Sequence, residues 1–369
     1  MSKDKKILHI FPESMQLEQF LIYMKEKYPQ VEHDFIIIDI GGSGEATRIK
    51  EHFYEIFKIT NISTFKPTDA LVLCKRLRDS KAYDNIIFHS LYLNYLLLAL
   101  FFNKKAVRRA TFIIWGVQDA GPFFVPETKS KYKIAGWFYE KLRSVIIPEF
   151  KYIGTVLDAD YDKVKKLYGV TAANKKCKYM LGAFNNKEQA EKKNRKHINI
   201  QAGHSGYKVT STLETLDTLS KFKDEDIRIF SPLSYGDEKY IQEVIKKGKE
   251  IFGKKFIPIT KQMSGTNFIK FISSMDIYIH NALVQMGLAN VFTNIAYRSK
   301  VYLNAEGAVY DEYTNIWGYT VSKVSDIREQ SFEEFIYLCP EEAEKNKLIS
   351  DYHGDAEDMK AVWDNLLES

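Results

Sequence analysis

The chain has 369 residues, of which 45% are hydrophobic, 27% charged and 14% aromatic. This composition is typical of a globular protein and the length suits about two domains, so disordered, collagen-like and coiled-coil proteins are excluded. The net charge of +5 does not by itself indicate a nucleic-acid-binding protein, and we expect no nucleic-acid partner.

The cysteines and the apolar runs of the sequence indicate the cellular compartment in which the protein is expected. Cys74, Cys177 and Cys339 form no CxxC pair, which disfavours a disulfide framework and a zinc site and favours a reducing compartment. The apolar run Ile7–Phe11 is too short for the core of a signal peptide, and nothing later approaches the about 18 apolar residues of a membrane-spanning helix. We therefore expect neither a signal peptide nor a transmembrane segment.

The first half alternates short β-branched runs with segments of helical length, a pattern typical of a parallel sheet covered by helices. The predicted strands are Lys6–Phe11, Phe35–Ile40, Asn85–His89, Thr111–Trp115 and Tyr152–Val156. The predicted helices are Leu17–Lys27, Asp69–Ser80, Tyr92–Phe102, Lys131–Val145 and Asp160–Tyr168. We therefore expect a first doubly wound α/β domain over residues 1–184.

Polar residues lie near the ends of these predicted strands. His9 and Glu13 belong to the first strand and its exit, His89 ends the third, and Asp119 follows the fourth. Carboxyl ends of parallel strands share one sheet edge, so we expect these side chains to converge there. A histidine or a carboxylate can take a proton from an attacking hydroxyl. All four are candidate general bases, although each histidine could instead be a hydrogen-bonded core residue.

The most apolar stretch of the chain directly precedes its sharpest basic cluster. Residues 91–102 read LYLNYLLLALFF, and Lys104, Lys105, Arg108 and Arg109 follow. An apolar helix beside cations gains both burial and surface attraction at an anionic bilayer. The alternative is a core helix whose final cations suit its dipole. The cluster is our candidate for contact with a membrane surface.

A polar segment, NNKEQAEKKNRK at 185–196, separates this domain from a second and is interpreted as a linker. The α/β pattern restarts over residues 197–345, with predicted strands His197–Ala202, Ile227–Phe230, Asp276–His280 and Lys300–Leu303. Helices are predicted at Ser211–Phe222, Tyr240–Phe252, Asn267–Met275 and Leu288–Tyr297. The rest of the chain, 346–369, is expected to contain a capped amphipathic C-terminal helix over Asp355–Leu367 (DAEDMKAVWDNLL). By analogy with similar proteins, this helix packs back on the first domain.

Three turns of the second domain carry small and polar residues just after strands, where open α/β sheets bind ligands. Small residues let backbone N–H groups at a helix start face an anion, so a nucleoside diphosphate would fit these turns. Each could also be a plain turn. The candidate donor-binding residues are Gly203, His204, Ser205, Gly206, Ser234, Tyr235, Gly236, Asn281, Gln285, Gly287 and Asn290.

Several catalytic motifs are missing from the sequence. It contains no GxxxxGK[ST], HExxH or DxD motif, and GHSG is not the GxSxG elbow of hydrolases. We therefore expect no metal site and no cofactor. Helix dipoles and basic side chains can neutralise a leaving diphosphate instead of a divalent ion.

Long runs carry a family resemblance. In the second half these runs are INIQAGHSGYKVTSTLETLDTL, IRIFSPLSYGDEKYIQEVIKKGKEIFGKKF and MDIYIHNALVQMGLANVFTNIAYRSKVYLN; in the first half they are LHIF, IIFHSLYLN and FIIWGVQDAG. In order and spacing, the chain resembles glycosyltransferase family 56. That family comprises the TDP-N-acetylfucosamine:lipid II N-acetylfucosaminyltransferases, also called 4-alpha-L-fucosyltransferases.

The resemblance implies a GT-B fold, with two Rossmann-like domains facing across a cleft. It places Gly203, Ser205 and Gly206 on the donor diphosphate, Tyr235 and Gly236 near the nucleotide, Gln285 and Gly287 along the donor sugar and phosphates, and His9, His89 and Asp119 toward the acceptor. His204 stands where the family commonly has asparagine.

We therefore expect a metal-independent glycosyltransferase of the hexosyl or fucosaminyl type. It would move a sugar such as N-acetylfucosamine from a dTDP or UDP donor to a lipid-linked oligosaccharide, for a bacterial surface or capsular polysaccharide. Its expected place is peripheral, on the cytoplasmic face of the inner membrane. Two alternatives stay open: a nucleotide-sugar epimerase of the same fold, and a non-catalytic partner subunit of a transferase.

Overall fold

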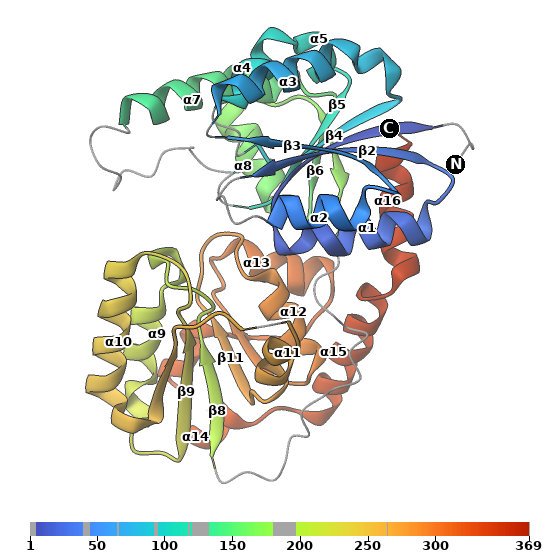
Figure 1. Cartoon of the computed structure of the whole chain (residues 1–369). Helices are drawn as coiled ribbons and strands as arrows, with labels where there is room; N and C mark the ends of the chain where they lie inside the picture. Colours follow the sequence, from blue (N-terminus) through green and yellow to red (C-terminus); the bar gives the residue numbers. More distant parts are fainter. Residues whose placement is uncertain are drawn as a thin grey trace. The chain divides into compact units, whose positions relative to one another are not determined.

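The computed structural model describes residues 5–39, 45–64, 66–91, 95–116, 119, 133–179, 197–263 and 265–368. The chain forms two compact units (Figure 1). The first comprises Met1–Met180 together with Ala356–Ser369, and the second comprises Leu181–Asp355. Within the described ranges, no helix combines the length and the apolar character needed to span a bilayer.

A seven-stranded sheet of parallel neighbours, in the order β3-β2-β1-β4-β5-β6-β7, forms the centre of the first unit. Its strands are β1 (Lys6–Pro12), β2 (Glu32–Asp39), β3 (Lys58–Ser63), β4 (Asn85–His89), β5 (Ala110–Ile114), β6 (Tyr152–Thr155) and β7 (Ala173–Lys176). The sequence predicted five of these strands. It missed β3 and β7, the two edge strands, whose half-exposed sequences KITNIS and ANKK lack a continuous apolar run.

Helices cover both faces of this sheet (Figure 1). Leu73, Leu97, Leu142 and Val164 bury one face, from α3 (Pro67–Arg78), α4 (Leu96–Phe102), α7 (Lys133–Ile146) and α8 (Asp158–Tyr168). The short α5 (Lys104–Val107) follows α4. The other face is covered by α1 (Met15–Lys27), α2 (Glu45–Phe53) and α16 (Ala356–Leu367).

Two helices occupy this end of the chain, and the second of them matches the helix expected over Asp355–Leu367. The α15 helix (Pro340–His353) ends at Gly354 and belongs to the second unit, whereas α16 belongs to the first. Trp363 of α16 is buried, and its indole N–H donates to the Lys178 carbonyl oxygen at 2.6 Å. The Asn85 side chain of β4 donates to the Leu366 carbonyl oxygen at 2.8 Å. The last helix is therefore part of the first unit's core.

The second unit contains a six-stranded sheet with parallel neighbours, in the order β10-β9-β8-β11-β12-β13. The strands are β8 (Ile198–Ala202), β9 (Ile227–Pro232), β10 (Phe256–Ile259), β11 (Ile277–His280), β12 (Lys300–Leu303) and β13 (Ser322–Lys323). Again the sequence missed the two edge strands, β10 and β13. Strand order reverses between β8 and β11, which is where doubly wound sheets bind ligands.

Two helix pairs flank this second sheet. The α9 helix (Thr212–Leu219) packs on α10 (Glu238–Phe252), and α11 (Gly265–Ser273) packs on α12 (Leu288–Ala296). The α15 helix packs against α12. The remaining helices, α13 (Ala308–Asp311) and α14 (Phe332–Ile336), are short. Both units are therefore doubly wound α/β layers, as the sequence predicted.

Candidate functional site

Three loops of the second unit meet at the carboxyl ends of β8, β9 and β11. The loop after β8 holds residues 203–206, and the loop after β9 holds residues 233–236. Gly206 and Gly236 pair in a parallel bridge, and the Gly206 N–H donates to the Tyr235 carbonyl oxygen at 2.8 Å. The third loop, 281–287, leads from β11 into α12.

Glycine is required where these loops touch. A Cβ added to Gly236 would lie 2.4 Å from the Gly206 carbonyl carbon, and one on Gly206 would lie 2.2 Å from the Ile241 side chain. The Gly203 N–H donates to the Ile279 carbonyl oxygen at 3.1 Å, and Gly203 has a φ of +71°. The amides of Gly203 and Gly206 therefore hold the loops together, so they are not spare anion donors. These two glycines serve the backbone geometry.

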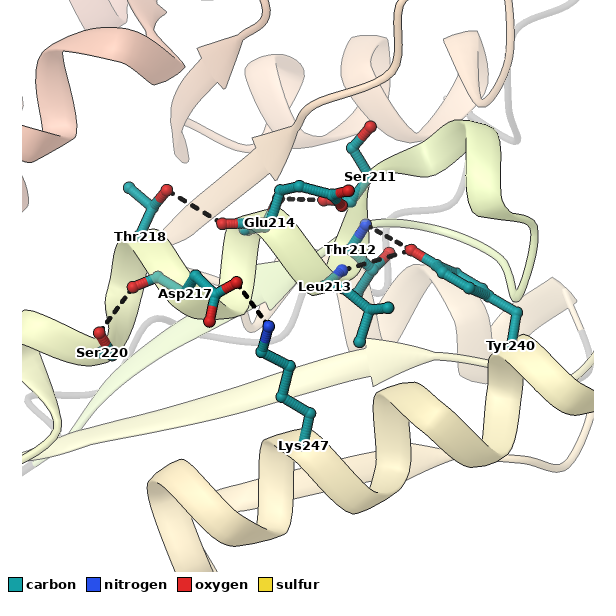
Figure 2. A network of polar contacts seen from close by, with 10 residues as sticks. Ser211, Thr212, Leu213, Glu214, Asp217, Thr218, Ser220, Tyr240 and Lys247 are labelled. Carbon is teal, nitrogen blue, oxygen red and sulfur yellow. Dashed lines mark hydrogen bonds and ion pairs between the residues drawn. The ribbon is translucent and has the colours of Figure 1, made fainter.

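The start of α9 was expected to face an anion, but its first backbone N–H groups donate to a side chain of the protein. The Tyr240 hydroxyl of α10 accepts from the N–H groups of Thr212 and Leu213 at 3.0 and 3.3 Å (Figure 2). An ion pair between Lys247 and Asp217 also joins the two helices, as Figure 2 shows. A phenol on the neighbouring helix therefore caps this start. No local sequence pattern indicates a cap that comes from a residue 28 positions away.

The start of α12 has a different environment. Its N-cap, Gly287, has a φ of +62°, and a Cβ there would lie 2.7 Å from the His204 ring. The glycine therefore lets the β8 loop and the helix start pack directly against each other. A nine-residue helix carries partial positive charge at this end. The first turn of α12 thus lies against the loop that holds His204 and Ser205.

Buried polar atoms without hydrogen-bond partners gather in these loops. They are both ring nitrogens of His204, the Ser205 hydroxyl, Nε2 of His280 and the Gln285 side-chain oxygen. His204 is 4% exposed and Ser205 is fully buried. Leaving one such atom unsatisfied costs about 1–3 kcal/mol, so a cluster of them indicates a place that a ligand or water completes.

His204 and His280 form a stacked pair, with ring centroids 5.3 Å apart and an interplanar angle of 22°. The Tyr278 hydroxyl lies 3.0 Å from His280 Nδ1. Burial lowers the pKa of His204 to about 4, and burial together with the neighbouring His204 lowers that of His280 well below its usual value. Both imidazoles are therefore neutral at pH 7. His280 was not among the residues predicted for this site, although its place at the end of a predicted strand was a usable signal.

Other predicted donor residues have structural partners. The Asn281 side-chain oxygen accepts from Asn304 at 2.9 Å, and that of Asn290 accepts from Gln201 at 3.1 Å. Tyr235 is 53% exposed and its ring makes an edge contact with Tyr207. Ser234, one residue earlier, is half-buried. Tyr235 thus offers an open aromatic surface beside the cluster, whereas Asn281 and Asn290 fix the loop and the helix.

In the first unit the structure brings His9 and His89 together in the core. His9 Nδ1 lies 3.0 Å from His89 Nε2, and His9 Nε2 lies 3.0 Å from His33 Nδ1. His89 Nδ1 bonds the Tyr179 hydroxyl. Burial lowers the pKa of His9 and His89 well below the usual value and that of His33 to about 4. His33 and Tyr179, which were not predicted from the sequence, complete this chain of neutral groups.

The two predicted carboxylates, Asp119 and Glu13, bond other groups than these imidazoles in the contacts that are resolved. Asp119 is fully buried, and its oxygens accept from the Ser90 hydroxyl and from the backbone N–H groups of Leu91 and Trp115 at 2.9–3.0 Å. Burial raises its pKa, and Arg143 opposes that rise. Glu13, 9% exposed at the exit of β1, accepts from the Ala46 N–H at 3.2 Å. Glu13 is the least buried of the four candidate bases.

The basic cluster after α4 lines a groove of about 860 Å³, which we call the basic groove. Lys104 and Arg108 pair with Glu149 at 3.1 and 2.7 Å, and Arg109 donates to the carbonyl oxygens of Ser80 and Tyr83. Its lining residues include the cations Arg78, Lys81, Lys104, Lys105, Arg108 and Arg109 and the aromatic Phe101 and Phe102. Phe102 is 73% exposed. Arg78 and Lys81, from the α3 side, were not foreseen in the sequence.

Residues 46–296 match the model of a family described as 4-alpha-L-fucosyltransferase glycosyl transferase group 56. The chain belongs to this family. Comparison with the sequences of curated proteins finds no match. The match to the family model extends over both units, so it includes the three loops of the second unit as well as the basic groove of the first.

Solved structures agree with this assignment. A glycosyltransferase from Rickettsia africae ESF-5 is 16% identical, with a TM-score of 0.64 over 98% of this chain and 97% of that one. HepE from Anabaena, in complex with UDP and glucose, is 12% identical, with a TM-score of 0.62 over 98% and 99%. A UDP-forming alpha,alpha-trehalose-phosphate synthase from Burkholderia vietnamiensis is 9% identical, with a TM-score of 0.61 over 99% and 97%. This group 56 glycosyltransferase has the GT-B fold, and the family and fold expected from the sequence are confirmed.

Proposed function

We propose that this glycosyltransferase uses a dTDP- or UDP-linked sugar whose diphosphate binds at the start of α12. The observation that carries the proposal is the cluster of buried, unpartnered polar atoms from His204, Ser205, His280 and Gln285. Phosphate oxygens would supply the missing hydrogen-bond partners, and the helix start would add favourable charge. Tyr235, open beside this cluster, would stack on the base.

The donor sugar and acceptor that we propose follow the family. The sugar is a deoxy or N-acetylamino sugar such as N-acetylfucosamine, and the acceptor is a lipid-linked oligosaccharide of a bacterial surface or capsular polysaccharide. HepE, which shares the fold, has been solved in complex with UDP-glucose, and this supports a nucleotide sugar as the donor here. Membership of a transferase family favours transfer over epimerisation of the sugar nucleotide alone.

For the acceptor hydroxyl, we assign the role of general base to Glu13. Both ring nitrogens of His9 and of His89 already face other side chains. Both carboxylate oxygens of Asp119 accept hydrogen bonds in a fully buried site. Glu13 leaves β1 at the carboxyl edge of the sheet, beside the β1–β4 switch point, where such folds place ligands.

The variant Glu13→Gln keeps the shape of the side chain and removes its basicity. We expect kcat for sugar transfer to fall about 10²–10⁴-fold with the donor KM nearly unchanged, because general bases contribute rate enhancements of that order. Transfer of a labelled sugar to a lipid extract containing polyprenyl-diphosphate saccharides measures this. Glu18→Gln, on an α1 residue that pairs with Arg48, is the matched control. Equal kcat in both variants would remove Glu13 from the mechanism.

The proposal includes a peripheral position on the cytoplasmic face of the inner membrane. Phe101 and Phe102 are exposed beside the cations of the basic groove, a combination suited to an anionic lipid surface. Exposed aliphatic and aromatic side chains on α3 and α7, Leu71, Ile134 and Trp137, extend the apolar area of the same helical layer. A lipid-linked acceptor would then be available where the enzyme docks.

Thermal unfolding in the presence of dTDP, UDP, GDP and CDP tests the donor site. A ligand that binds the folded chain raises its melting temperature by mass action, so dTDP or UDP should raise it, and more than GDP or CDP do. The same preparation should then transfer sugar from the matching sugar nucleotide to lipid-linked saccharides. No shift with any of the four nucleotides would overturn the assignment of the donor site.

A further inference from the structure

His204 and His280 place two neutral imidazoles inside the proposed donor site. Both nitrogens of His204, and Nε2 of His280, are buried without a hydrogen-bond partner. Neutral imidazole carries one N–H donor and one acceptor nitrogen, so each unpartnered ring forgoes at least one hydrogen bond. In the enzyme without donor, the two neutral rings therefore have nitrogen atoms that can accept a proton or donate a hydrogen bond to an anion.

The described residues around His204 and His280 place neither a cation nor a carboxylate against the two rings. The lowered pKa of His204 is due to burial, and no carboxylate of the described residues counters it. The titratable group that contacts the pair is the phenol of Tyr278 from β11, whose hydroxyl lies 3.0 Å from His280 Nδ1 and whose pKa burial raises well above its usual value. The Tyr235 phenol of the β9 loop adds to that rise in the pKa of Tyr278. On the α12 side, Gly287 contributes backbone alone. An incoming diphosphate would thus be the dominant charge near the two rings.

A diphosphate in this position would favour the protonated form of an imidazole, whereas burial alone favours the neutral form. An opposite charge within about 4–6 Å raises the pKa of a base, by about 1–3 units for a close ion pair. Burying the diphosphate without a counter-charge is also costly, because an unpaired ion in a poorly solvated site loses its hydration. Proton uptake by an imidazole lowers both costs at once.

We propose that the nucleoside diphosphate binds together with one proton, which His204 takes up while stacked on His280. The proposal rests on the donor site assigned above. The proton comes from solvent when the donor binds. During transfer, the acceptor hydroxyl oxygen forms a bond to the sugar anomeric carbon and gives its proton to the general base, Glu13. The bond between that carbon and the diphosphate oxygen breaks, and its electron pair stays on the diphosphate oxygen. The His204 imidazolium balances the added negative charge, and its proton leaves when the nucleoside diphosphate is released.

Isothermal titration of the full chain with UDP and with dTDP tests this coupling. Measuring the heat at one pH in two buffers of different ionisation enthalpy gives the number of protons exchanged. We expect net proton uptake at pH 6.5, reaching about 0.8 proton per nucleotide for a rise of about 3 units from the free pKa of about 4, and affinity that weakens by up to about tenfold per pH unit as the pH rises toward 7. The variant His204→Gln should bind more weakly, with no proton uptake.

The control is His197→Gln, at an ion pair with Asp226 at the opposite end of β8, which should behave as the unaltered protein does. Imidazole carbon chemical shifts of the unaltered protein, with and without UDP, give a readout that needs no variant: one ring should change from neutral to cationic. Nucleotide binding without proton uptake would overturn this inference and leave the donor site standing. Undiminished proton uptake by His204→Gln would also overturn it. A chain that binds neither nucleotide would overturn the donor site itself.

Discussion

In the loops of the second unit, a glycine without a side chain lets a histidine ring pack against the start of a helix. Gly287 gives up its side chain so that α12 can begin against the ring of His204, and that ring in turn lies on His280. The sequence predicted Gly287 and His204 as members of one site because each follows a strand. It could not predict that the two touch, because contact between residues 83 positions apart depends on strand order, which a single sequence does not contain.

Gly287→Ala should therefore damage the site in two ways. The left-handed backbone costs a non-glycine residue about 1–2 kcal/mol, and the new methyl group must also displace the His204 ring. Gly169→Ala is the matched control, because Gly169 has nearly the same φ and ψ with open space around it. We expect similar backbone strain in both variants, whereas nucleotide affinity, measured by titration, falls in Gly287→Ala alone. Equal affinities would contradict the proposed role of this contact.

At the scale of elements, the sequence predicted the central strands and failed at the sheet edges. Central strands such as β1 and β11 are buried on both faces and read as apolar runs, whereas β7 (ANKK) is held in its sheet by tertiary pairing. The starts of α9 and α12 looked alike in the sequence. A distant phenol, that of Tyr240, caps one of them, and this long-range contact decides which start can serve a ligand.

The basic groove is a second feature that several elements make together, and it yields a prediction for membrane binding. Changing the exposed cations Arg78, Lys81 and Lys105 to serine should weaken binding to anionic vesicles about 100-fold, since each cation near such a surface contributes about 1 kcal/mol. Flotation with vesicles of phosphatidylglycerol and phosphatidylcholine measures this, with phosphatidylcholine alone as reference.

The matched control removes three exposed lysines from the second unit, with the changes Lys239→Ser, Lys249→Ser and Lys254→Ser. The net charge then falls equally in both triple variants. Binding lost equally in both would show that overall charge, and not the groove, attracts the bilayer. Flotation unaltered by the Arg78, Lys81 and Lys105 changes would end the proposal that this groove docks on lipid.

Across the whole molecule, each unit buries neutral histidines, and this makes stability depend on pH. In the unfolded chain a histidine titrates near pH 6.5, whereas burial lowers the folded pKa of His33 and His204 to about 4 and that of His9, His89 and His280 well below the usual value. Below pH 6.5 the unfolded chain binds more protons than the folded one. Stability is therefore complete above that pH and is lost as the pH falls toward 4.

We expect the free energy of unfolding to fall by about 1.4 kcal/mol per pH unit for each such histidine between pH 6 and pH 4.5. Urea unfolding across this range measures the slope. His33→Gln should reduce the slope. A midpoint that stays constant from pH 7 to pH 4.5 would contradict the neutral state assigned to these rings.

Because α16 completes the core around Phe20 and Trp363, the first unit is assembled from the two ends of the chain. A ribosome makes most of that unit first but delivers its last helix only after the entire second unit has been synthesised. During synthesis the second unit can fold while the first unit still lacks α16 and therefore exposes an apolar face. A stop codon or proteolytic cut near residue 355 should therefore destabilise the first unit, which contains the amino-terminal part of the chain. Expressing the two units separately would require α16 to be fused to the amino-terminal fragment.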